Sequence, residues 1–280
     1  MSDLRLRARS VTEIVDAAFQ LYKRDALEYV LMAAVPYAPL IVAQLVFFRG
    51  TSFGTAAQIT TASTTGQIVV LVVSVLAYTL MSAVLIRFSS EVYLERPIAL
   101  SEVIQSVAKL VPRLIGAGIL LALVVTLGFI PLIVGTLLTN GLFIFLGFLI
   151  AFVWIFYAVA RYFAIFQLIV IENRGIMEAF TRSSTLSKDR KGHILLTFFL
   201  IFLIFWLLSL AVGVIALLSA ALMAGSAVTV VAQTLYTVIA YPLIGITQMI
   251  LYYDARIRAE GFDIEVMAGS LGAPPATSIT

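Results

Sequence analysis

The sequence has no cysteine, one histidine and few charged residues. Without cysteine there is no disulfide, no thiolate nucleophile and no cysteine-ligated metal. The single histidine, His193, has no second imidazole with which to form a paired-histidine metal site. Charged residues make up 12% of the chain, about half their usual share in soluble proteins. These scarcities remove the usual components of catalytic and metal sites, so we expect no cofactor, no metal and no enzyme activity.

Hydrophobic residues are abundant instead, at 62% of the 280 residues with a mean hydropathy of +1.09. Water-soluble cores of ordinary size could not bury so much apolar surface, so we expect lipid to cover it. We therefore predict an all-α fold, a polytopic membrane bundle of six transmembrane helices. The predicted spans are the long apolar stretches Tyr29–Phe48, Ile68–Ile86, Leu114–Leu138, Leu142–Ile171, Ile194–Leu218 and Ala227–Tyr253.

Nearly all charged residues fall on one side of these spans. Of the 18 Lys and Arg residues, 16 lie on the side that holds both termini, as do all 15 acids. Arg49 lies on the other side, and Arg161 lies inside span four. Because basic residues gather on the cytoplasmic side of a membrane, we predict that both termini are cytoplasmic. The net charge of +3 does not indicate nucleic acid as a partner.

Turn and proline residues divide the apolar stretches. Thr139–Gly141 and Ala224–Ser226 are turn sequences, which predicts helical hairpins between spans three and four and between spans five and six. The connection Gly50–Gly66 is uncharged and predicts an outer loop. Prolines inside the spans mark kinks, at Pro36, Pro39, Pro131 and Pro242.

Three eleven-residue segments share one pattern: an apolar residue, Glu two positions later, two apolar residues, and Leu eight positions after the Glu. They are Val11–Leu21, Leu100–Leu110 and Ile176–Leu186. Each predicts a short amphipathic helix at the membrane interface. The residues expected to cap these helices are Ser10, Glu13, Glu102 and Glu178, because a carboxylate in the first turn stabilises the helix dipole.

The repeated unit is then one interfacial helix followed by two spans. We predict a single integral-membrane domain over residues 1–268 with pseudo-repeats at 10–88, 99–171 and 175–253, followed by a flexible C-terminal tail at 269–280. Each unit has an even number of spans, so all three enter the membrane in the same orientation. A pseudo-threefold axis would therefore run along the membrane normal.

Four stretches resemble one known family, the bacterial glycerophosphoryl diester phosphodiesterase membrane-domain family. They are Arg9–Arg24, Arg161–Glu172, Met177–Lys188 and Tyr252–Asp263. The resemblance implies a polytopic protein of the bacterial cytoplasmic (inner) membrane whose activity is largely unassigned. Some relatives also carry a catalytic phosphodiesterase domain, which needs acids and paired histidines around a metal. We expect no such activity from this chain, since it has a single histidine.

Arg161 is the one ionisable residue well inside an apolar stretch. Placing Arg at the centre of a span costs about 2.5–3.5 kcal/mol, so we expect an interaction that compensates for this cost. One interpretation is an arginine that snorkels to the interface or pairs with backbone carbonyls. The other is an anion site for a lipid phosphate in the cytoplasmic leaflet, with Gln167 and Gln248 as polar companions.

Three classes of function remain open from the sequence. We favour a non-enzymatic integral membrane protein that binds anionic lipid or acts as a scaffold or accessory protein. Its expected partners are membrane lipids, and besides them another membrane protein or further copies of the chain. The alternative is a passive transporter or pore along the pseudo-threefold axis, since no acid lies deep in the spans to couple protons. An integral-membrane enzyme comes last, with residues drawn from Glu172, Glu178, Asp189 and His193.

Overall fold

A computed structural model describes residues 7–47, 64–96, 98–221, 226–264 and 266. Every regular element in these ranges is an α-helix, which confirms the prediction of an all-α fold. The predicted tail at 269–280 lies outside the described residues, as do most of the predicted loop at 50–66 and residues 224 and 225 of the second predicted turn.

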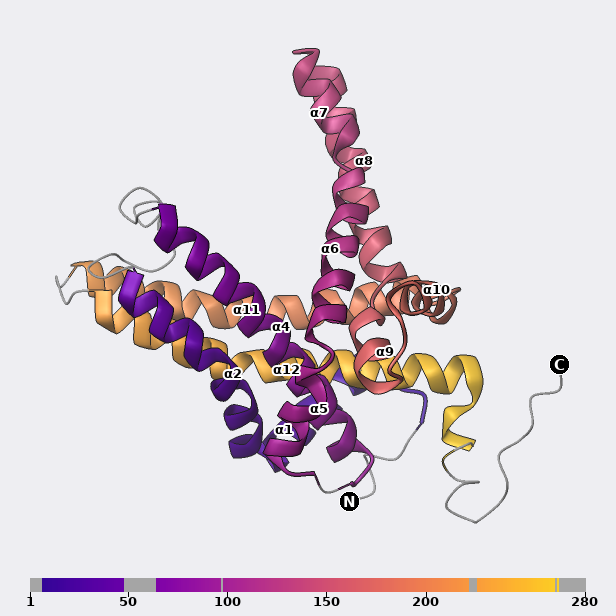
Figure 1. The fold of residues 1–280 in the computed structure, drawn as a ribbon. Helices are drawn as coiled ribbons and strands as arrows, with labels where there is room; N and C mark the ends of the chain where they lie inside the picture. Colours follow the sequence, from indigo (N-terminus) through magenta and orange to yellow (C-terminus); the bar gives the residue numbers. More distant parts are fainter. Residues whose placement is uncertain (1–6, 48–63, 97, 222–225, 265, 267–280) are drawn as a thin grey trace. The chain divides into compact units, whose positions relative to one another are not determined.

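The described helices range from short elements of seven residues to long ones of more than thirty (Figure 1). They are α1 (Val11–Arg24), α2 (Ala26–Phe47), α4 (Thr64–Tyr93), α5 (Leu100–Ala108), α6 (Val111–Leu127), α7 (Ile130–Leu137), α8 (Gly141–Arg161), α9 (Ile165–Ile171), α10 (Ile176–Leu186), α11 (Lys191–Ala221) and α12 (Ser226–Glu260). Within the described residues, the predicted amphipathic segments correspond to α1, α5 and α10.

Five segments of the described chain are long and apolar enough to cross a membrane: Ala26–Gln44, Thr64–Tyr93, Gly141–Ile171, Lys191–Leu218 and Val231–Glu260. A sixth crossing results when α5 and α6, which meet at a bend of 59°, count as one span. A helical membrane span needs about 20 apolar residues, because the hydrocarbon core is about 30 Å thick. The chain is therefore a multi-pass membrane protein.

The third predicted span, Leu114–Leu138, is wrong as a single helix. The chain breaks at Gly128 and Phe129, between α6 and α7. Pro131 is the second residue of α7, and its ring would clash with the carbonyl of Leu127, four residues earlier. Helix α6 ends at that residue. Pro36, Pro39 and Pro242, in contrast, lie inside continuous helices.

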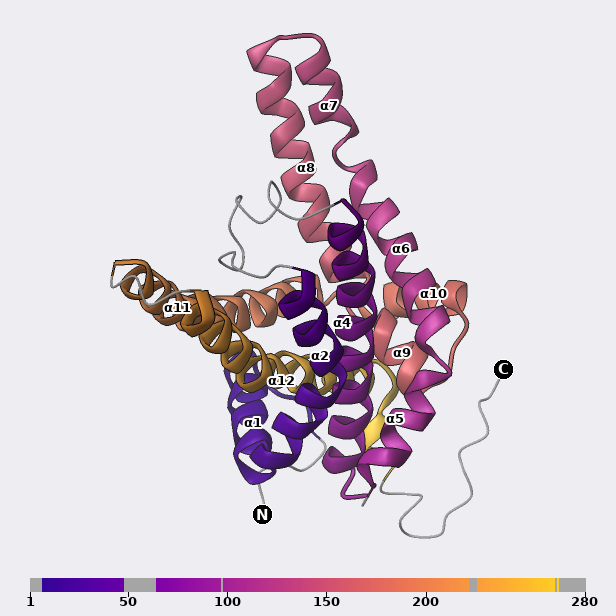
Figure 2. The same ribbon diagram turned by 60° about the vertical axis from the view of Figure 1, so that its left-hand side comes forward.

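Helices α7 and α8 form a hairpin with very close backbones (Figure 2). The Asn140 side chain caps α8 by accepting a hydrogen bond from the Leu142 N–H at 3.0 Å, which confirms the first predicted turn. A Cβ atom on Gly147 would lie 2.6 Å from Leu132 Cα, and one on Gly135 would lie 2.7 Å from the Phe143 carbonyl oxygen. Only glycine permits this approach, because real Cβ contacts are not so short.

The short amphipathic helices bury the faces that the pattern predicts. The buried residues are Ile14, Ala18 and Leu21 in α1, Val103 and Val107 in α5, and Ala179, Ser183 and Leu186 in α10. In all three segments, the residues one and five positions after the Glu are thus buried. This agreement favours the predicted pseudo-repeats, which stay a prediction.

The predicted caps form in two of the three helices. The Glu13 carboxylate accepts from the Ser10 N–H at 2.7 Å, and the Glu13 N–H donates to Ser10 Oγ at 3.4 Å. The Ser10 N–H and the nearby Arg7 lower the pKa of Glu13 to about 2. Glu178 accepts from the Gly175 N–H at 3.3 Å. Glu102 lies in the first turn of α5 as expected, but the residue before that helix, Ala99, makes no side-chain cap.

The chain divides into two compact units. Unit 1 takes its described residues from 1–17, 116–198 and 247–280, and unit 2 takes its own from 18–115 and 199–246. Unit 2 contains a row of aromatic rings, in which Tyr78 lies 5.7 Å from Tyr37 and 5.9 Å from Tyr241 between ring centroids. The Tyr241 hydroxyl also lies 3.0 Å from Ser82 Oγ. The prediction of one domain over residues 1–268 stays a prediction.

The glycine contact in the hairpin gives a stability test. We expect Gly147→Ala to lower the free energy of unfolding in detergent by about 1–3 kcal/mol, because the added methyl group overpacks the α7–α8 contact. Gly118→Ala is the matched control, since a Cβ at Gly118 would meet nothing within 4 Å. That change should be neutral or stabilise by up to about 1 kcal/mol through helix propensity. Equal melting temperatures for the two variants would contradict the close approach.

Candidate functional site

The candidate residue Arg161 ends α8, and the helix is interrupted there. Residues 162–164 separate α8 from α9, within the fourth predicted span. The interruption leaves the Arg161 carbonyl and the Ala164 N–H without helical partners. Ser183 Oγ donates to the carbonyl at 3.1 Å and accepts from the N–H at 3.2 Å, and Ser187 Oγ donates to the same carbonyl at 3.2 Å. These serines of the α10 segment therefore satisfy the backbone groups that an interrupted helix would otherwise leave unpaired in a membrane.

The Arg161 guanidinium lies between two tyrosine rings. Its Cζ atom is 5.7 Å from the Tyr157 ring centroid and 5.6 Å from that of Tyr162, and Nη1 donates to the Tyr157 hydroxyl. The Nε atom is buried and has no hydrogen-bond partner among the described residues. In the part of the chain that the structure describes, no carboxylate lies within 4.0 Å of this guanidinium. A positive charge in the last turn of α8 also interacts favourably with the helix dipole.

The predicted companions of Arg161 meet each other but not Arg161. Gln167 Nε2 donates to Gln248 Oε1 at 3.4 Å, and Gln167 is almost fully buried. Gln167 Oε1 has no partner among the described residues. Neither amide is hydrogen-bonded to Arg161 within those residues, and the three-residue site stays a prediction. The guanidinium instead donates to Tyr157 and lies over the rings of Tyr157 and Tyr162.

Unit 1 also contains a network of ion pairs around Glu172, which follows α9. The Tyr252 hydroxyl donates to Glu172 Oε1 at 2.7 Å. The Nε atoms of Arg182 and Arg174 lie 2.7 and 3.1 Å from Oε2, and that of Arg256 lies 3.8 Å from Oε1. One carboxylate thus joins α12 to α10 and to the loop before it.

Glu260 shares two of these arginines. Its carboxylate lies 3.0 Å from Arg182 Nη2 and 3.1 Å from Arg256 Nε. Helix α12 therefore contributes both an acid and a base to the network. The Arg256 guanidinium also covers the Phe262 ring at 4.0 Å from its centroid.

Asp254 forms a second network with the N-terminal segment. This residue is 2% exposed, and its Oδ1 accepts from the Arg9 backbone N–H at 2.7 Å. Its Oδ2 accepts from Arg258 Nε at 2.9 Å and lies 3.3 Å from His193 Nε2. Arg258 Nη2 donates in turn to the Arg9 carbonyl at 2.7 Å. The backbone of Arg9 is thus held on both sides by residues of α12.

Sequence reasoning missed both networks. Tyr252 lies at a span end, where aromatic residues commonly contact lipid headgroups, yet its side chain is fully buried. The available signal was the alternation of Asp254, Arg256, Arg258 and Glu260 along α12, which places charges four residues apart on one helix side. The partners of these charges lie about 80 or 250 residues away in the chain, where a local pattern has no information.

The residues considered for an enzyme each have a different structural position or contact. Glu172 pairs with arginines, Glu178 caps α10, and His193 lies beside Asp254. Asp189 has a positive φ of 62° in the turn before α11. No group of three His, Cys, Asp or Glu side chains in the described chain is placed to hold a metal ion.

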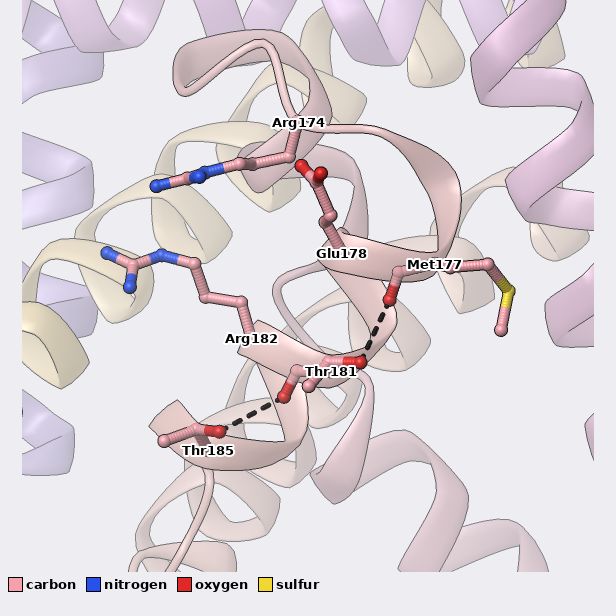
Figure 3. A pocket seen from close by; sticks show the side chains of 6 residues that line it. All are labelled: Arg174, Met177, Glu178, Thr181, Arg182 and Thr185. Carbon is pink, nitrogen blue, oxygen red and sulfur yellow. Dashed lines mark hydrogen bonds between the residues drawn. The ribbon is translucent and has the colours of Figure 1, made fainter.

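A pocket of about 480 Å³ lies beside α10 (Figure 3), lined by Arg174, Met177, Glu178, Thr181, Arg182 and Thr185. The two arginine side chains extend in the same direction there, and both belong to the Glu172 network. The hydroxyls of Thr181 and Thr185 donate to carbonyls one turn earlier, each at 3.1 Å. The polar groups of this pocket are therefore already engaged.

The contribution of the ionised Glu172 side chain to stability can be tested. Burial raises the pKa of Glu172, but hydrogen bonds from Tyr252 and Arg182 outweigh burial and bring the pKa below its ordinary value of 4.5. We expect Glu172→Gln to lower the free energy of unfolding by about 1.5–3 kcal/mol at pH 7.5, because charge-assisted hydrogen bonds are lost. Thermal unfolding in detergent measures the difference.

The pH dependence has a definite sign. The stability that Glu172 contributes is complete above its ordinary pKa of 4.5 and is lost as the pH falls through the lower value in the folded protein. The difference between wild type and Glu172→Gln should therefore shrink below pH 4.5. Glu28→Gln is the control, since Glu28 is exposed in the first turn of α2, and it should change stability by less than about 0.5 kcal/mol. Equal unfolding of wild type and Glu172→Gln at pH 7.5 would contradict the network.

Function has to be argued from the geometry of this chain. No protein-family model, no curated protein and no solved structure matches it. The resemblance of the four stretches to the membrane-domain family thus stays a prediction.

Proposed function

We propose that this chain is a non-enzymatic protein of the bacterial cytoplasmic membrane that binds the phosphate of an anionic lipid at the cytoplasmic boundary. One observation supports this most: Arg161 has no carboxylate partner in the described chain, although acids are available in the same unit. Arg174, Arg182 and Arg256 all lie within 4.0 Å of Glu172, and Arg258 pairs with Asp254. The protein neutralises these four arginines from within and leaves Arg161 to an external anion.

The chemistry of the arginine suits a lipid phosphate. A guanidinium is always charged, and its planar fork of donors matches two phosphate oxygens. The rings of Tyr157 and Tyr162 both lie near this fork, and its Nε has no hydrogen-bond partner among the described residues. At a membrane boundary the abundant anions are lipid headgroups, which attract basic side chains.

A contact between the chain ends supports the cytoplasmic placement of both termini. The Arg9 backbone is hydrogen-bonded to Asp254 and Arg258 near the end of α12. Segments in contact at the two ends of a membrane protein lie on the same side of the bilayer. This agrees with the charge asymmetry, which is an independent argument.

Membership of the glycerophosphoryl diester phosphodiesterase membrane-domain family is part of the same proposal. The four resembling stretches contribute Arg9, Glu172, Arg182 and Asp254 to the two networks of unit 1. Shared residues with a common structural role are what membership would require. The three interfacial helices α1, α5 and α10 would then form the cytoplasmic scaffold of the domain.

The proposed topology predicts that both ends face the same compartment. Reporter fusions at the N- and C-termini, one active only in the cytoplasm and one only in the periplasm, should both report the cytoplasm. A fusion in the connection around Gly54 should report the opposite side. Ends that report different compartments would contradict an even number of crossings.

The proposed lipid site predicts a loss of binding in Arg161→Gln. We expect the affinity for phosphatidylglycerol, measured by native mass spectrometry of the purified full chain, to fall about tenfold, because one or more charge-assisted hydrogen bonds are lost. Phosphatidylcholine, which has no net charge, should bind equally weakly to both proteins.

The matched control is Arg96→Gln, which removes an exposed arginine that has no side-chain partner among the described residues. This variant should keep the wild-type affinity, and both variants should keep the melting temperature of a folded protein. An unchanged affinity in Arg161→Gln, or an equal loss in Arg96→Gln, would contradict the proposed site.

A further inference from the structure

A second cation, Lys191, lies on the same tyrosine as Arg161. Its Nζ atom is 5.3 Å from the Tyr157 ring centroid, and Arg161 Cζ is 5.7 Å from that centroid. The sum of these distances, 11.0 Å, is the greatest separation that the two charges can have. Lys191 comes from α11 and Arg161 from α8, so the fold brings together two cations that are 30 positions apart.

Lys191 stands at the unfavourable end of its helix. It is the first residue of α11, where unpaired N–H groups and the helix dipole are already positive. Arg161, in the last turn of α8, has a structural reason for its position, but Lys191 has none of that kind. The described residues also place no carboxylate within ion-pair distance of Lys191. Two cations and a positive helix end thus converge on one ring without an acid of the protein to balance them.

The hydrogen-bonding groups around the ring suit an oxyanion. The Arg161 Nε–H is buried and has no partner in the part of the chain that the structure describes. The Tyr157 hydroxyl accepts from Arg161 Nη1, which leaves its own proton free to be donated. Lys191 adds up to three donors on a flexible stem, so its ammonium can move towards a bound anion.

We infer that Arg161, Lys191 and Tyr157 form a site selective for a doubly charged lipid headgroup. This deepens the proposed function and rests on it: a site with one cation binds any anionic lipid, whereas a site with two cations and no acid favours two negative charges. Such a headgroup is either a phosphomonoester, with both charges on one phosphate, or a lipid with two phosphodiesters. The bound charge would neutralise both side chains and the start of α11.

The test compares three lipids with the same acyl chains. The purified full chain is titrated by native mass spectrometry at pH 8 with phosphatidylglycerol, which carries one charge, with phosphatidic acid, a phosphomonoester, and with cardiolipin, which has two phosphodiesters. We expect phosphatidic acid or cardiolipin to bind wild type at least about fivefold more tightly than phosphatidylglycerol, since each basic residue near a membrane contributes about that factor. Whichever lipid is preferred identifies the source of the two charges.

Lys191→Gln should reduce this preference about fivefold. Lys188→Gln is the matched control, because Lys188 is exposed and only three residues away, and it should keep the wild-type preference. Circular dichroism and the melting temperature confirm that both variants fold.

The outcomes separate this inference from the proposed function. Equal binding of all three lipids by wild type would overturn the inference, as would an equal loss of preference in the two lysine variants. In either case Arg161→Gln would still weaken phosphatidylglycerol and the proposed function would stand. If Arg161→Gln has no effect on any lipid, both are overturned.

Discussion

The buried carboxylate of Asp254 is the interaction on which the arrangement of unit 1 depends most. It binds a backbone N–H of the N-terminal segment and a guanidinium of its own helix, and it is 2% exposed. Removing one partner from such a buried group leaves the others without compensation, at a cost of several kcal/mol. Asp254 thereby holds Arg9 against α12, directly before the Ser10–Glu13 cap with which α1 begins.

The same requirement explains the break between α8 and α9. In a bilayer an unpaired backbone group costs several kcal/mol, so an interrupted helix needs partners from elsewhere. Ser183 and Ser187 of α10 supply them at the Arg161 carbonyl and the Ala164 N–H. The short helix α10 therefore completes a membrane segment, which a role as a passive interfacial helix would not require. The backbone of Arg161 is thereby satisfied within the protein, and its side-chain Nε is not.

The features that could be predicted from the sequence are those that local physics decides. Hydropathy predicts the helices, the Ser10–Glu13 spacing predicts a capping box, and Asn140 predicts the hairpin turn. The hairpin of α7 and α8 was predicted, but the close backbone contacts at Gly135 and Gly147 and the Tyr252–Glu172 hydrogen bond could not be, because they depend on which helix faces pack together. Arg161 was found as a candidate because a charge in an apolar stretch is locally conspicuous. Lys191 follows several charged residues, so one more cation at this position does not indicate a binding site from the sequence.

The two cations of the proposed site differ in freedom, and this difference suggests separate roles. The Arg161 guanidinium donates to Tyr157 and contacts the rings of both Tyr157 and Tyr162, so it determines where a phosphate can bind. Lys191 contacts one of these rings from a flexible stem, so it can adjust to one phosphate or to a second one nearby. The negative end of the α8 dipole partly balances the charge of Arg161. The positive end of the α11 dipole adds to the charge of Lys191, so the uncompensated positive charge is greatest near Lys191. Selectivity for the charge of a headgroup should therefore depend on Lys191 and affinity for any phosphate on Arg161.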